Sequence, residues 1–163
     1  MILIINICKE KLHYFEFVKP IEDILKNKNI KFFTRHYLEL NNTDLAKSDK
    51  IIICGTSLKD NDFIMHLDKF SWIKKFTSPI FGICGGAHVI GLVLGYKLKK
   101  NKEIGLKELN INEEFLGVKG KLEVYHLHQF AALPEIFHKD NLYSTLFHPE
   151  VRNKNIIEEF TKK

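Results

Sequence analysis

The sequence predicts an α/β fold in which a mostly parallel sheet lies between two layers of helices. Short apolar runs without in–out alternation recur along the first half of the chain, as expected for strands covered on both faces. Segments with the helical spacing of apolar residues separate these runs, as in successive strand–helix–strand units. In such sheets ligands bind beyond the carboxyl ends of the strands, so we expect a three-layer protein with its site along one sheet edge.

The individual elements follow from the positions of the apolar residues. Strands are expected at residues 1–8, 30–34, 50–54 and 80–83. Helices are expected at residues 17–27, with Pro20 near the start, and at residues 64–73 and 86–95. The pattern then changes, because apolar and polar residues alternate over residues 104–111 and a turn-rich link is expected at 115–120. Two further strands are expected at residues 122–127 and 142–147, and a closing helix at 155–160.

The composition, with 45% hydrophobic and 28% charged residues, is that of an ordinary globular protein. The length fits one domain, so residues 1–163 are expected to form a single domain. No basic leader precedes the apolar run at Met1, and no apolar segment reaches the roughly 18 to 20 residues that span a bilayer. We therefore expect no membrane partner. Cys8, Cys54 and Cys84 have no paired spacing, which favours a reduced, cytoplasmic protein.

The net charge of +5 is spread over lysines that are mixed with acidic residues, so we expect no nucleic-acid partner. Residues 97–102 contain the one dense group of lysines. We expect a solvated surface there, with the docking of an acidic partner as the alternative.

Residues 79–95 carry the first chemical motif, because Gly82 and Gly86 flank Cys84 at the spacing of a nucleophile elbow. A strand, a tight turn and a helix are expected, and a Cβ at either glycine would crowd the turn. The free N–H groups at the start of the helix favour a thiolate at Cys84. The alternative is a buried core cysteine followed by a glycine-rich loop.

A second motif follows the strand candidate near the end of the chain. His148 and Glu150 lie there with a proline between them that fixes the turn. A nucleophilic cysteine needs a base, and the base needs a third group that orients its ring. Cys84, His148 and Glu150 can serve as nucleophile, base and orienter, with Glu150 on one ring nitrogen of His148 and the sulfur near the other. Taken alone, His148 could be a turn residue and Glu150 the first acid of the closing helix.

The two motifs together, Gly82-Ile-Cys84-Gly-Gly86 and Phe-His148-Pro-Glu150, resemble the signature pair of the class I, triad-type glutamine amidotransferases. The resemblance covers nearly the whole chain and implies their flavodoxin-like fold. It also implies that Cys84 attacks the side-chain amide of glutamine, that ammonia leaves, and that water releases glutamate from the thioester. His148 would act as base and then acid, and Glu150 would orient it.

The resemblance also implies further site residues and a partner. Backbone N–H groups of Gly85 and of the Gly55-Thr56 turn would form the oxyanion hole. Residues 127–134, Leu-His-Gln followed by Leu-Pro, are similar to a family insert, so Leu127, His128 and His88 would bind the substrate. No cofactor is implied. A separate synthase would receive the ammonia, and the end of the chain is somewhat more similar to the small subunits of two-subunit GMP synthases.

The sequence departs from the family pattern at three places. The family usually has Cys-x-Gly-x-Gln, but the fifth position here is His88, interpreted either as a substrate contact or as a partly exposed residue of the first helical turn. The glycine loop at Gly55 is reduced. Few residues separate Pro134 from His148, so a hairpin is expected to be missing there.

Two other functions and a metal site are alternatives. His88 and the missing hairpin leave open a stand-alone γ-glutamyl hydrolase or peptidase, and a non-catalytic binding or regulatory domain could retain the same fold. His126 and His128 share one face of a strand and could join His148 at a metal. No nearby carboxylate pair completes such a set in the sequence, so no metal is expected.

Overall fold

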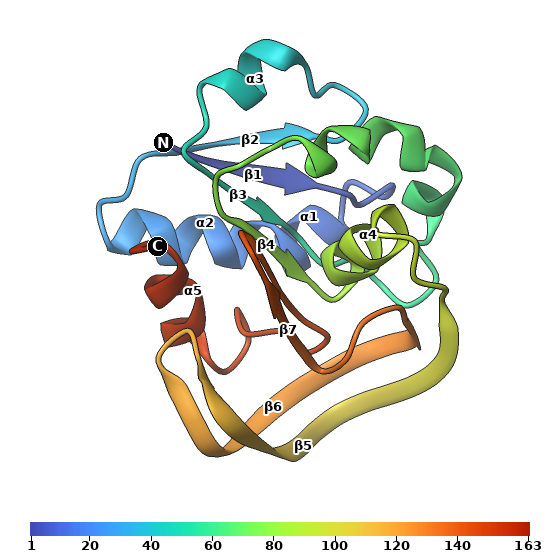
Figure 1. Cartoon of the computed structure of the whole chain (residues 1–163), viewed down its shortest axis with the longest axis vertical. Coiled ribbons are helices and arrows are strands. Elements are labelled where there is room, and N and C mark those ends of the chain that lie inside the picture. Colours follow the sequence, from blue (N-terminus) through green and yellow to red (C-terminus); the bar gives the residue numbers. More distant parts are fainter.

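The computed structural model describes residues 1–163, and a six-stranded sheet with the order β2-β1-β3-β4-β8-β7 forms its centre (Figure 1). All neighbouring strands are parallel except β7, which is antiparallel to β8 at the edge. The strands are β1 (Ile2–Asn6), β2 (Phe32–His36), β3 (Lys50–Ile53), β4 (Ile80–Ile83), β7 (Ile136–Lys139) and β8 (Leu142–Thr145). The predicted mostly parallel sheet is confirmed.

Helices cover both faces of this sheet. They are α1 (His13–Phe17), α2 (Lys19–Asn27), α3 (Asn42–Ala46), the 3₁₀ helix η1 (Asp62–Lys74), α4 (Gly85–Val93) and α5 (Lys154–Phe160). Side chains of α1, α2 and α5 pack in one hydrophobic core, and those of η1 and α4 pack in the other. Successive residues of β1 alternate between the two, with Ile4 in the first core and Leu3 and Ile5 in the second.

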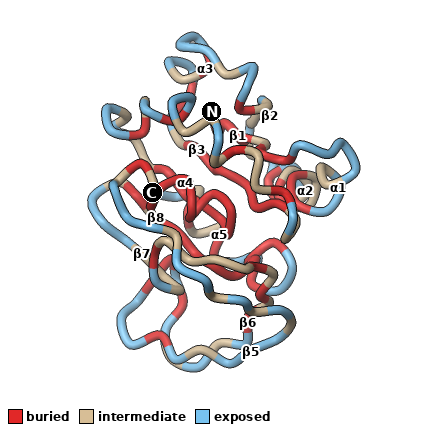
Figure 2. The backbone as a smooth tube through the Cα atoms, turned by 90° about the vertical axis from the view of Figure 1, so that its right-hand side faces the viewer, coloured by how far each residue is buried: buried red, intermediate tan, exposed pale blue.

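A long two-stranded arm, β5 (Lys99–Phe115) paired antiparallel with β6 (Val118–Ala131), curves beneath the sheet (Figure 1). Its inner side chains, among them Ile111, Phe115 and Val124, belong to the first core. Its outer surface is largely exposed, as the pale stretches of the tube in Figure 2 show. The arm therefore brings residues of β6 next to the carboxyl ends of β4 and β8. There the Cys84 thiol donates to the carbonyl of Leu127, and the backbone N–H of His148 donates to the carbonyl of Tyr125.

Four features differ from the sequence prediction. The alternating segment at residues 104–111 and the link at 115–120 belong to the longer strands β5 and β6, which turn at Leu116 and Gly117. The segment expected as a helix at residues 64–73 is a 3₁₀ helix interrupted at His66, and α3, which Asn41 caps, was not predicted. Between Pro134 and His148, where a family hairpin was expected to be missing, β7 and β8 form a short hairpin. Only Asp140 and Asn141 connect these strands, and the left-handed backbone of Asp140, with φ 54°, makes so short a connection possible.

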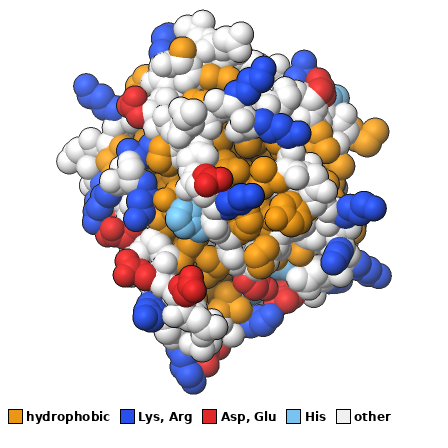
Figure 3. All heavy atoms as spheres, viewed as in Figure 1, with side chains coloured by type: hydrophobic (Ala, Val, Ile, Leu, Met, Phe, Trp, Pro, Cys, Tyr) orange, Lys and Arg blue, Asp and Glu red, His pale blue; other side chains and the backbone are white.

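The surface carries mixed charge. On the face shown in Figure 3, basic and acidic side chains lie scattered around a central area of hydrophobic ones. Lys97, Lys99, Lys100 and Lys102 are exposed and form no ion pair, as expected of a solvated surface. None of the helices combines the length and the apolar character that crossing a membrane requires.

Candidate active site

Cys84 lies at the turn between β4 and α4 in a strained conformation, with φ 48° and ψ −99°. A Cβ added at Gly82 would lie 2.6 Å from the carbonyl of Gly86, and one added at Gly86 would lie 2.2 Å from the carbonyl oxygen of Ile53. These distances are far below van der Waals contact with backbone that cannot move aside, so both positions require glycine. The predicted strand–turn–helix elbow around Cys84 is confirmed.

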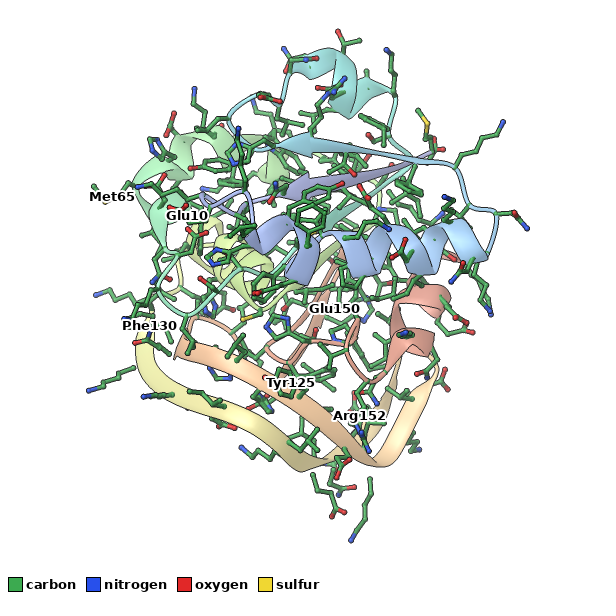
Figure 4. All side chains as sticks on the ribbon, turned by 180° about the vertical axis from the view of Figure 1, so that it is seen from behind. Glu10, Met65, Tyr125, Phe130, Glu150 and Arg152 are labelled. Carbon is green, nitrogen blue, oxygen red and sulfur yellow. The ribbon has the colours of Figure 1, made fainter.

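His148 and Glu150 form a buried pair just after β8. His148 Nδ1 lies 2.7 Å from Glu150 Oε1, and both side chains are almost completely inaccessible. The backbone N–H of His148 donates to the carbonyl of Tyr125 on β6, and the ring of Phe17 lies 5.5 Å from the imidazole. Figure 4 shows Glu150 inside the molecule, between α2 and the arm. The sheet, the arm and α1 thus fix the imidazole together.

Cys84 and His148 meet at Gly55, which follows β3. A Cβ added at Gly55 would lie 2.6 Å from His148 Cε1 and 3.5 Å from Cys84 Cβ, so both side chains rest against the same backbone. The second ring nitrogen of His148, Nε2, has no hydrogen-bond partner. The Cys84 thiol donates instead to the carbonyl of Leu127 at 3.5 Å. The expected position of Glu150 on one ring nitrogen is therefore confirmed, and the other nitrogen is free.

The electrostatics of this group favour a charged imidazole. Burial lowers the pKa of His148, but the charges of Glu150 and Cys84 outweigh burial and raise this pKa well above its usual range. An imidazolium therefore lies between a carboxylate and a cysteine sulfur. The raised pKa of His148 thus places a positive charge beside the Cys84 sulfur.

Two backbone N–H groups lie beside the Cys84 elbow. Gly85 is the first residue of α4, and a Cβ added there would lie 3.6 Å from the backbone nitrogen of Thr56. The Gly55-Thr56 turn is held by two hydrogen bonds, from Thr56 Oγ1 to Asp60 at 2.8 Å and from the Cys8 thiol to the carbonyl of Gly55 at 3.6 Å. The residues expected to form an oxyanion hole are thus neighbours in space.

The three residues expected to bind substrate, His88, Leu127 and His128, line one small cavity with Cys84 and Gly85. The interpretation of His88 as a partly exposed residue is wrong, because its side chain is 4% exposed and its Nδ1 has no partner. Burial, with smaller contributions from His128 and His148, lowers the pKa of His88 to about 4. The cavity measures about 10 Å³, room for a single water molecule.

Gln129, whose part the sequence does not reveal, links the two walls of this cavity. Its side-chain amide donates to the carbonyl of Leu58 at 2.7 Å and so joins β6 to the loop after Thr56. Figure 4 shows the neighbouring Phe130 where the arm meets the rest of the molecule. The partner is a backbone group 71 residues away in the chain, and no local pattern signals such a contact.

One cluster of side chains has the composition and spacing to hold a metal. The structure brings Glu103 and Glu135 to His126 and His128, so the carboxylate pair that the sequence lacks at close range is supplied by distant segments. His148 belongs to the buried pair with Glu150 and takes no part in this cluster.

The fold and the site define an α/β protein with a cysteine at a nucleophile elbow and a buried histidine–glutamate pair beside it. The family model of class-I glutamine amidotransferases matches residues 14–136, and the chain belongs to this family. The matched range contains Cys84 and ends before His148 and Glu150.

Solved structures agree with this fold. A Thermoplasma acidophilum protein, described provisionally as one subunit of a GMP synthase, is 18% identical with a TM-score of 0.82, over 99% of this chain and 92% of that one. A glutamine amidotransferase from Thermotoga maritima is 20% identical with a TM-score of 0.66, over 99% and 82%. One from Methylobacillus flagellatus is 16% identical with a TM-score of 0.60, over 100% and 75%. No curated protein matches the sequence.

Proposed function

We propose that this chain is a glutaminase subunit that hydrolyses glutamine through Cys84, His148 and Glu150 and passes the ammonia to a separate synthase. The observation that carries the proposal is the buried His148–Glu150 pair, with its 2.7 Å contact, beside a cysteine on a strained elbow. A structural cysteine needs neither the strained backbone nor a cationic imidazole next to it.

The geometry supports a two-step reaction, in which a thioester forms at Cys84 and water then hydrolyses it. The thiolate of Cys84 attacks the amide carbon of glutamine, and the oxyanion that forms accepts hydrogen bonds from Gly85 and from the Gly55-Thr56 turn. The His148 imidazolium gives its proton to the leaving nitrogen, and ammonia departs from a glutamyl thioester. Water then attacks the thioester while His148 accepts a proton, and glutamate leaves with the thiolate restored.

The transfer of ammonia to a partner rests on two observations. The T. acidophilum protein described as part of a GMP synthase has the same fold over 92% of its length. A protein with that description can therefore be about as long as this chain. The cavity at Cys84 is small and Gln129 bridges its two walls, which suits an enzyme whose site widens when a partner docks. We propose further that residues 1–163 act as one domain in the cytoplasm.

The test measures glutamate and ammonia release from glutamine, with and without the ATP-dependent subunit of a two-subunit GMP synthase. We expect turnover that rises with the synthase and falls about 10³-fold or more in Cys84→Ser, the loss typical of removing a nucleophile. Cys54→Ser, at a buried cysteine outside the cavity, is the matched control.

Two outcomes would replace the proposal. Fast turnover of a γ-glutamyl peptide without a partner, and none of glutamine, would make the chain a stand-alone hydrolase. If Cys84 is alkylated at pH 7 no faster than a free cysteine and no glutamine analogue labels it, the chain is a binding domain.

A further inference from the structure

Four side chains that the proposed reaction does not require as nucleophile, acid or base converge beside the active site. His126 and His128 project from β6, Glu103 from β5 and Glu135 from the segment before β7. One potential ligand atom from each lies within 4.8 Å of all the others. The two histidine side chains are almost fully buried, and the glutamate side chains are 23% and 30% exposed.

A chain of hydrogen bonds fixes the tautomer of both histidines. The carbonyl of Asn101 can only accept, so His128 Nδ1, at 2.9 Å, carries a proton and donates to it. His128 Nε2 then accepts from His126 Nδ1 at 3.0 Å. With its Nδ1–H engaged in this way, a neutral His126 ring presents a lone pair on Nε2, which has no hydrogen-bond partner.

This nitrogen faces two carboxylates. His126 Nε2 lies 3.9 Å from Glu103 Oε2 and 3.6 Å from Glu135 Oε2, and neither His126 Nε2 nor Glu135 Oε2 has a hydrogen-bond partner. Three groups that accept but do not donate therefore point at one another, an arrangement that a cation between them would stabilise. Ligands about 2.0 to 2.2 Å from a tetrahedral zinc ion lie roughly 3.5 Å apart, close to these separations.

A lysine occupies part of this arrangement. Lys107 Nζ lies 2.7 Å from Glu103 Oε2, and its side chain is 47% exposed, so it can turn away into solvent. An open hollow of about 310 Å³, lined by residues 102–107 and His126, gives an entry path from the surface. Lys107 would thus compete with a bound metal for one carboxylate.

We propose that Glu103, His126 and Glu135 bind a Zn²⁺ ion, with His128 as a positioning residue that holds the His126 ring through its other nitrogen. One imidazole and two carboxylates suit this borderline metal, and a histidine that donates its second N–H to a fixed acceptor is the usual arrangement around zinc. The three ligands come from β5, β6 and the segment before β7, so the ion would fasten the arm to the sheet. This proposal does not depend on glutamine hydrolysis.

The experiment uses the full chain in a Cys84→Ser background, which removes the reactive thiol as a competing ligand. Metal-free protein is titrated with Zn²⁺ against a chromogenic chelator, and thermal unfolding is followed with and without Zn²⁺. We expect one ion per chain, bound at least about 100-fold more weakly in Glu103→Gln and Glu135→Gln, and a Zn²⁺-dependent rise in melting temperature that these variants lose. His128→Ala should weaken binding about 10- to 100-fold, as for other residues that hold a ligand in place.

Two further variants make the test specific. Glu108→Gln removes an exposed carboxylate of the same strand, 64% accessible, and should leave the affinity unchanged. Lys107→Ala removes the competing ammonium and should tighten Zn²⁺ binding, which no purely structural role of the cluster would produce. Absence of stoichiometric binding, or equal affinity in Glu103→Gln, Glu135→Gln and Glu108→Gln, would overturn the proposal. Both results leave the glutaminase proposal intact, because the background protein lacks Cys84.

Discussion

At the scale of single residues, the buried ion pair between His148 and Glu150 places charge beside the Cys84 sulfur. Both members of the pair are buried, so solvent does not screen either charge. Removing the carboxylate leaves an imidazolium without its partner, a change that typically destabilises a protein by roughly 3 to 5 kcal/mol unless the ring gives up its proton.

Glu150→Gln should therefore lower the pKa of His148, because the carboxylate raises it against the opposing effect of burial. Less of Cys84 would be paired with an imidazolium at pH 7, and its alkylation by iodoacetamide should slow about tenfold for each unit by which the His148 pKa falls below the assay pH. The measurement is the alkylation rate as a function of pH. Glu123→Gln, at an exposed carboxylate, is the control, and identical pH profiles for the two variants would contradict the ion pair.

His88 makes the protein sensitive to acid. Burial lowers its pKa from 6.5 to about 4, so between these values the unfolded chain binds a proton that the folded chain does not. The free energy of unfolding therefore decreases as the pH falls through this window, by an amount of roughly 3 kcal/mol for a shift of this size.

His88→Gln removes this proton uptake, so its free energy of unfolding should decrease less between pH 7 and pH 4.5 than that of the wild type. Urea unfolding at a series of pH values measures it. His138→Gln replaces an exposed histidine and should retain the wild-type dependence. The same dependence in His88→Gln would show that other groups cause the acid sensitivity.

At the scale of elements, the β4–α4 elbow depends on close backbone contacts that leave no room for a Cβ atom. Gly86→Ala places a Cβ 2.2 Å from the carbonyl oxygen of Ile53, at the centre of the sheet. We expect a loss of roughly 3 kcal/mol or more in the free energy of unfolding, since overpacked cores typically lose 1 to 3 kcal/mol even where side chains can yield.

The comparison for Gly86→Ala is Gly105→Ala on the arm. Gly105 has φ 102° but nothing within 4 Å of an added Cβ, so only backbone strain, about 1 to 2 kcal/mol, should appear there. Denaturant unfolding of both variants is the measurement. Equal losses would mean that the elbow can relax.

The elements that the sequence predicts well are those whose own residues form a recognisable apolar or glycine pattern. The parallel strands are continuous apolar runs because both faces are covered, and Gly82 and Gly86 mark the elbow by themselves. Short pieces such as α3 and β7 carry too few apolar residues for a period to emerge. The arm was only partly predicted, because its outer face meets solvent and even Ile104 and Leu106 are exposed there.

In the candidate site, too, the sequence predicts features that have a local motif and misses contacts between distant segments. Cys84, His148 and Glu150 could be identified because motif spacing places each at a strand end. The links from Gln129 to Leu58 and from Glu103 and Glu135 to His126 join segments far apart in the sequence. Such contacts arise from the path of the arm, which nothing in the local sequence specifies.

At the scale of the whole molecule, the arm and the loop after Thr56 line the small cavity at Cys84, and the side chain of Gln129 joins them. Gln129→Ala removes the hydrogen bond to Leu58 and should allow the cavity to open more often. We expect faster alkylation of Cys84, with a larger gain for a bulky maleimide than for iodoacetamide, because the larger reagent needs the wider opening. Alkylation rates of the two reagents measure this.

Lys121→Ala, at an exposed side chain elsewhere on β6, is the matched control for Gln129→Ala. Unchanged rates in Gln129→Ala would mean that the access of reagents to Cys84 is set elsewhere.

The order of strands in the sheet also constrains how the chain matures during synthesis. β4 pairs with β8, yet the entire arm lies between them in the sequence, so the edge of β4 stays unpaired until the last strand has been made. The arm can fold earlier by itself, because its two strands are neighbours in sequence. His148 and Glu150 arrive with β8, in the step that covers the open edge. Cys84 therefore gains this buried pair as a neighbour only after β8 has been made, and a chain that ends before His148 lacks it.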